Sequence, residues 1–129
     1  MARSLNIITD AWMNSPDLPE INENGVSNLF VGILPADSEE QIKQKHSILI
    51  REYDDDRVMV FGGGSVLKNA EYHVEFLAPS PRQLESLVNR AMTIVRATRR
   101  MAHYETIEAP EYYLDLKCYA KTLRLIMWR

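Results

Sequence analysis

The chain has 129 residues, which is the length of a single domain with one continuous core. Hydrophobic residues make up 46% of it and charged residues 26%, values that are typical of globular domains and exclude a disordered or fibrous protein. Its apolar runs are far shorter than the roughly 20 residues that span a bilayer, and its first residues lack the apolar stretch of a signal peptide. The single Cys118 cannot form an internal disulfide framework, so we expect a cytoplasmic domain with a buried, inert thiol.

The net charge of −3 is unevenly distributed along the chain. Residues 14–56 contain ten acidic and three basic residues, whereas residues 82–129 contain nine basic and five acidic residues. If these two halves form different faces, identical subunits attract each other head to tail, which is the kind of contact that closes rings. The alternative is a solvated surface on which the charges differ by chance.

The first half of the chain predicts one helix followed by strands. Leu5, Ile8 and Trp12 recur at helical spacing, and this helix is expected to end before Pro16. The sequence then predicts a surface connection over residues 17–25 and a strand over residues 26–34. A polar loop or helical turn over residues 37–45 and a second strand over residues 46–53 follow.

Two turn signals follow the second predicted strand. Asp54-Asp55-Asp56 predicts a turn, because aspartate tolerates turn geometry and bonds its own backbone. A third strand is expected over residues 57–61, and Gly62-Gly63-Gly64 ends it. Alternating apolar residues then predict a fourth strand over residues 71–77.

The strongest local signal begins at Ser80. Ser80 is expected to cap a helix, Pro81 suits the first helical position, and Gln83 completes a capping box. The apolar residues behind it recur in steps of three and four and predict an amphipathic helix that ends near residue 100.

The last part of the chain predicts further strands. We expect a strand over residues 102–107, a turn at Ala109-Pro110 and a long strand from Tyr112 onward. Residues 122–129 are expected to continue this last strand or to pair with it. The whole chain is therefore predicted to be one α+β domain, a mainly antiparallel sheet with two helices packed on one face.

No group of residues predicts a catalytic, cofactor-binding or metal site. His46, His73 and His103 lie on separate predicted strands and lack the short-spaced pair that seeds a zinc site. Carboxylates such as Asp54-Asp55-Asp56 suit a divalent cation, but this run lacks the alternating spacing of a calcium loop, and a solvated turn is favoured. In Gly62-Gly63-Gly64-Ser65-Val66-Leu67-Lys68 the lysine comes too late for a phosphate loop, so we expect a hairpin tip.

The most enzyme-like feature is Asp115-Leu116-Lys117. Restriction-type nucleases carry a motif on a strand in which an acidic residue is followed, after one intervening residue, by a lysine. Another acidic residue upstream holds the metal ion. Glu111 is too close in the sequence to supply that second acid from a separate strand. We therefore favour the polar face of an amphipathic strand.

The order of these elements resembles the tail terminator (tail-completion) proteins of long-tailed bacteriophages. The resemblance covers nearly the whole chain and depends on an N-terminal amphipathic helix, three strands and one helix that starts at Ser80-Pro81. The strand sequences are Ser47-Ile48-Leu49-Ile50-Arg51, Tyr72-His73-Val74-Glu75-Phe76-Leu77 and Tyr113-Leu114-Asp115-Leu116-Lys117-Cys118-Tyr119.

The resemblance implies a hexameric ring that ends polymerisation of the tail tube and docks on the head connector in the virion, after assembly in the host cytoplasm. The implied partners are other copies of the chain, the tail tube protein and the head–tail connector protein, and no cofactor is implied. The loops expected to make the contacts are Asp54, Asp55, Asp56 and the segment with Gly62, Gly63, Gly64 and Lys68.

Three other functions stay open from the sequence. A neck or head-completion protein has the same layout at a neighbouring position in the virion. A small metal-dependent nuclease would use Asp115 and Lys117, and a ligand-sensing α+β domain would be a small dimer stabilised by a metabolite.

Overall fold

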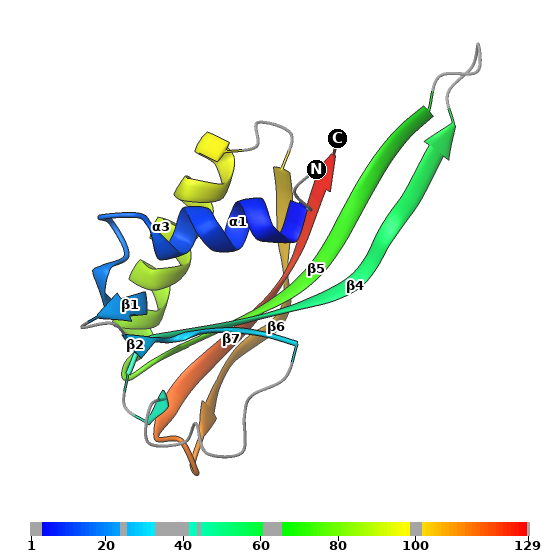
Figure 1. Ribbon diagram of the computed structural model, residues 1–129. Helices are drawn as coiled ribbons and strands as arrows, with labels where there is room; N and C mark the ends of the chain where they lie inside the picture. Colours follow the sequence, from blue (N-terminus) through cyan, green and yellow to red (C-terminus); the bar gives the residue numbers. More distant parts are fainter. Residues whose placement is uncertain are drawn as a thin grey trace.

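The computed structural model describes residues 4–23, 26–32, 42–43, 45–60, 66–98 and 102–128 (Figure 1). The elements in chain order are α1 (Ser4–Met13), η1 (Pro19–Ile21), β1 (Asn22–Glu23), β2 (Val26–Ser27), β3 (Leu29–Val31), β4 (Ser47–Val60), β5 (Val66–Ala78), α3 (Pro81–Thr98), β6 (Ala102–Tyr113) and β7 (Cys118–Trp128).

One five-stranded sheet organises the fold, with the strand order β3-β4-β5-β7-β6. Its long strands pair antiparallel, and only the short β3 runs parallel to its neighbour β4, with Leu29 opposite Ile48. The short strands β1 and β2 form a separate antiparallel pair. The prediction of an α+β domain with a mainly antiparallel sheet is therefore confirmed.

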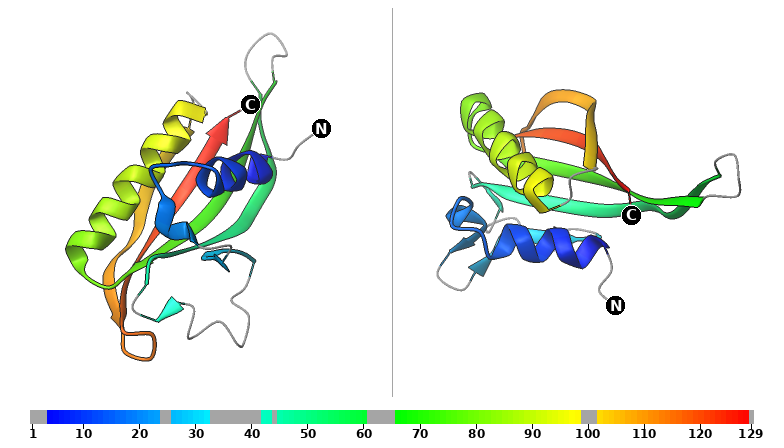
Figure 2. Two further views of the ribbon diagram at one scale, coloured as in Figure 1. Left: turned by 60° about the vertical axis from the view of Figure 1, so that its left-hand side comes forward. Right: turned by 90° about the horizontal axis from the view of Figure 1, so that it is seen from above.

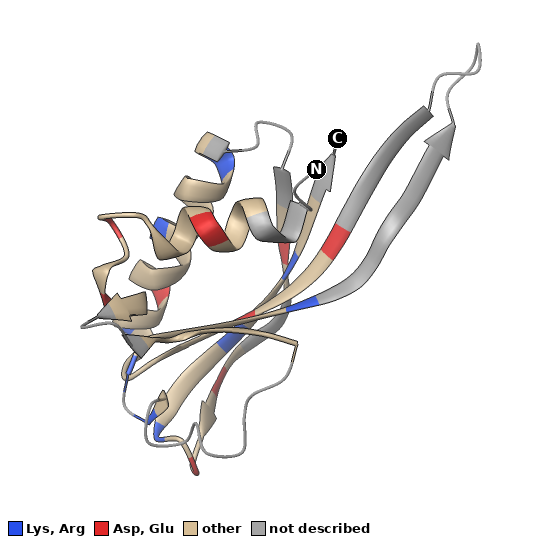
Figure 3. Cartoon of the chain, in the orientation of Figure 1, with Lys and Arg blue, Asp and Glu red and all other residues tan. Residues whose placement is uncertain are grey.

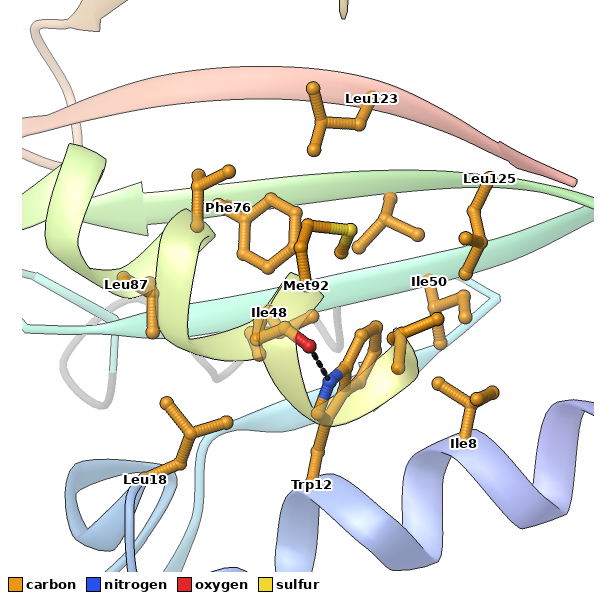
Figure 4. Close-up of a cluster of buried hydrophobic side chains, with 14 of the residues drawn as sticks. Ile8, Trp12, Leu18, Ile48, Ile50, Phe76, Leu87, Met92, Leu123 and Leu125 are labelled. Atoms are coloured by element: carbon orange, nitrogen blue, oxygen red, sulfur yellow. Dashed lines mark hydrogen bonds between the residues drawn. The ribbon is translucent and has the colours of Figure 1, made fainter. Parts of the chain in front are cut away.

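The main core joins side chains from both helices to alternate residues of the sheet (Figure 4). Trp12 of α1 is fully buried; its indole Nε1–H donates a hydrogen bond to the carbonyl of Ala91 in α3 at 3.1 Å. The Trp12 ring also meets the ring of Phe76 in β5 edge to face, with centroids 6.2 Å apart. Because an indole buried without a partner for its N–H is costly, this bond fixes how α1 sits against α3.

A second, smaller cluster contains residues of the sheet whose side chains alternate with those of the main core. Leu77, Cys118 and Ala120 are buried there together with Ile42. The Cys118 thiol lies 3.4 Å from the carbonyl oxygen of Ile42. The expectation of a buried thiol is confirmed, because the segment around Ile42 covers it.

The helix that begins after Ser80 is confirmed as α3, and its capping differs in one detail from the predicted box. The backbone N–H of Gln83 donates to the Ser80 hydroxyl oxygen at 3.2 Å. The Ser80 hydroxyl donates in turn to Oε1 of Gln83 at 3.0 Å. The Gln83 side chain thus holds the capping hydroxyl in place.

The predicted turn at Asp54-Asp55-Asp56 is wrong, because these residues lie within β4, a single continuous strand of 14 residues. The pairing with β5 shifts register between Glu52 and Asp54 and again between Asp54 and Arg57. The irregular pairing accommodates the extra residues as a bulge, so strand pairing over the length of β5 overrides the local turn signal.

The predicted turn at Ala109-Pro110 is also wrong, because β6 runs through it to Tyr113. Pro110 is tolerated there because β6 is an edge strand and its register with β7 is irregular between Glu108 and Glu111. The chain turns at residues 114–117 instead, and Lys117 takes the positive φ of 52° that the reversal needs.

Two earlier segments also differ from the prediction. Residues 17–25, expected to be a plain connection, include η1 and β1. The strand expected over residues 26–34 is divided into β2 and β3, because the backbone N–H of Asn28 turns to donate to the carbonyl of Ile21 at 2.7 Å.

Candidate functional site

The residues expected to make assembly contacts fall on the β4–β5 hairpin. Asp54, Asp55 and Asp56 lie on β4, and Lys68 lies on β5, where its backbone pairs with Val58. Gly62, Gly63 and Gly64 lie outside the described residues. The four described candidates, Asp54, Asp55, Asp56 and Lys68, thus lie on paired strands rather than in loops.

The end of this hairpin forms what we call the distal ribbon, residues 58–60 of β4 and 66–68 of β5. Its three pairs are Val58 with Lys68, Met59 with Leu67 and Val60 with Val66. The pairing of β5 with β7 begins only at Asn69, so within the described residues the ribbon has two strands. In Figures 1 and 2 it extends away from both helices and past the ends of β6 and β7.

The composition of the distal ribbon is unusual for a projecting element. Of its six residues, only Lys68 is polar. A two-stranded ribbon is at best marginally stable in water, and it becomes stable when a third strand or another layer packs on it. The ribbon is therefore a candidate contact element.

A groove lies between α3 and the β6–β7 hairpin, near the opposite end of the sheet. Its first part has a volume of about 260 Å³ and is lined by Pro81, Leu84, Glu85, Val88, Asn89, Pro110 and Lys121. Its second part has a volume of about 440 Å³ and is lined by Pro79, Tyr112, Lys117 and Tyr119. The two parts lie along the same side of β7, because Tyr119 and Lys121 are alternate residues of that strand.

Aromatic rings form the floor of the second part of the groove. Tyr112 of β6 and Tyr119 of β7 are register partners, and their ring centroids are 4.9 Å apart. The Tyr112 side chain is 46% exposed and Leu114, in the following turn, is 77% exposed. Large apolar and aromatic surface that stays accessible is typical of a contact surface.

The charge of the groove is weakly positive. Lys117 and Lys121 line it on the sheet side, and Glu85 lines it on the α3 side. Figure 3 shows both basic and acidic residues at the end of the sheet that carries the β6–β7 turn. The acidic Asp54-Asp55-Asp56 run is on β4, and Arg57 separates it from the distal ribbon.

Two further charged groups join elements inside the molecule. On the sheet, Nε of Arg124 lies 2.8 Å from a carboxylate oxygen of the buried Glu71 and 3.2 Å from one of Glu105. Beside α3, Arg90 forms an ion pair with Glu20 and donates to the carbonyl of Asp17 at 2.9 Å. Both groups connect segments that are distant in the sequence.

The Arg90 group perturbs two acid–base equilibria. Burial raises the pKa of the Glu20 carboxyl, but the hydrogen bond and charge of Arg90, a backbone hydrogen bond and the charge of His46 together leave the pKa of Glu20 below its ordinary value. Burial lowers the pKa of His46, and Glu20 and Arg90 act on it in opposite directions. The net effect places the pKa of His46 below its ordinary value.

The nuclease pattern does not have the geometry that was expected of it. Asp115 and Lys117 lie in the turn between β6 and β7 rather than on a strand, so the sequence interpretation of residues 115–117 as part of a strand is wrong. His46 precedes β4, while His73 and His103 lie on β5 and β6. Among the described residues, no three histidine, cysteine or acidic side chains gather closely enough to hold a metal ion.

The sequence did not reveal the groove. The sequence predicts Pro110 only as part of a turn, and it assigns no site to Pro79, Tyr112, Tyr119 or Lys121. Their convergence depends on the pairing of β6 with β7 and on where α3 lies, neither of which follows from local sequence.

No protein-family model matches the chain, and no curated protein is similar to it in sequence. None of the described helices is both long and apolar enough to span a membrane.

Proposed function

We propose that this chain is a structural ring subunit of a long-tailed bacteriophage, a tail terminator that caps the tail tube and joins it to the head connector. The class of function is assembly rather than chemistry. The proposal includes a fold in which both helices lie on one face of the sheet, and the cluster that joins Trp12, Phe76 and Leu123 supports this part of it.

The distal ribbon supports this proposal most directly. A small domain that projects an apolar two-stranded ribbon from its sheet has a built-in element for contact with another subunit. The groove at the other end of the sheet, with its exposed Tyr112, is a second contact surface. Two different surfaces at opposite ends are what a heterologous, ring-closing contact needs.

The mechanism of such a subunit is geometric. Each copy contributes one surface to each neighbour, and the ring closes when the rotation between neighbours divides a full turn. The closed ring then presents one side to the tail tube and the other to the connector. The charge asymmetry between residues 14–56 and 82–129 would orient neighbours during assembly.

The experiment is light scattering on the purified protein over a range of concentration and salt, alone and with tail tube protein. A discrete species near six subunits, or one induced by tube protein, is the expected result. A monomer or small dimer under all of these conditions would contradict the proposal. Magnesium-dependent DNA cleavage lost in Lys117→Ala, or stabilisation by a metabolite, would then point to the nuclease or the ligand-sensing domain.

A neck or head-completion protein would form a similar ring at a different place. Binding assays with separate tube and connector proteins distinguish the two. A terminator binds both, whereas a ring that binds the connector alone belongs in the neck.

A further inference from the structure

We draw no further inference here: the strongest candidate, the surface patch of the exposed Tyr112 and Leu114 at the end of the β6–β7 hairpin, carries none because nothing in the described part of the chain shows what covers it.

Discussion

Arg124 of β7 reaches across the sheet to Glu71 of β5, and its Nε lies 2.8 Å from the Glu71 carboxylate. The Glu71 side chain is 1% exposed, whereas that of Arg124 is 37% exposed. The pair therefore consists of a buried acid and a base that still touches water. Burying a carboxylate without a partner is costly, so the arginine has a structural role in holding β5 and β7 together.

Removing Arg124 should destabilise the fold more than removing Glu105, the exposed acid that also pairs with Arg124. We expect Arg124→Leu to lower the free energy of unfolding by about 2 to 3 kcal/mol, because Glu71 is left buried without its cation. Glu105→Gln should cost less than about 1 kcal/mol, because its carboxylate is half exposed. Urea denaturation followed by circular dichroism measures both, and equal effects would contradict this account.

Trp12 offers a test of the contact between the helices. Trp12→Ala should lower the free energy of unfolding by about 4 kcal/mol, since it leaves a cavity in the main core. Trp12→Phe keeps most of the volume but loses the bond to the Ala91 carbonyl, and should cost about 1 to 2 kcal/mol. Asn14→Ala, at an exposed position after α1, is the control. A Trp12→Phe chain as stable as the unaltered one would show that the hydrogen bond contributes little.

His46 should make stability depend on pH. Its pKa is lowered below the ordinary value of 6.5, mainly by burial, so the unfolded chain takes up its proton first as the pH falls. Stability from this group is complete above the ordinary value and declines as the pH falls through it toward the lower folded pKa. His46→Gln should remove this decline in urea denaturation at a series of pH values, and an unchanged profile would contradict the assignment.

Glu20 should act in a more acidic range. Its folded pKa lies below the ordinary 4.5, so its stabilising effect is present above that value and is lost as the pH falls through the folded pKa. Because Arg90 is the partner, Glu20→Gln should flatten the acid limb of the stability profile and leave the decline from His46 in place. If the acid limb persists in Glu20→Gln, other carboxyls cause it.

The helices show how much of this fold local sequence determines. The spacing of Leu5, Ile8 and Trp12 predicts α1, and the signal at Ser80 predicts the start of α3, because both depend on interactions within one or two helical turns. The α+β class follows in the same way. These features need no knowledge of what lies far away in the chain.

The hairpins show what local sequence does not determine. Asp54-Asp55-Asp56 and Ala109-Pro110 both have turn chemistry, yet both lie within strands, since pairing along a neighbouring strand outweighs a local preference. The reversal at residues 114–117 replaces the second of these turns, and it removes the strand geometry that a nuclease pattern at Asp115 and Lys117 would need.

The sequence by itself determined the α+β class, the two helices and the buried Cys118. Only the tertiary structure decided the strand order, the ribbon that has two strands within the described residues, and the convergence of Pro79 with Tyr112 beside α3. The reason is physical: helices and caps depend on neighbours in the chain, whereas sheets and grooves depend on contacts between segments that chain entropy keeps apart until folding brings them together.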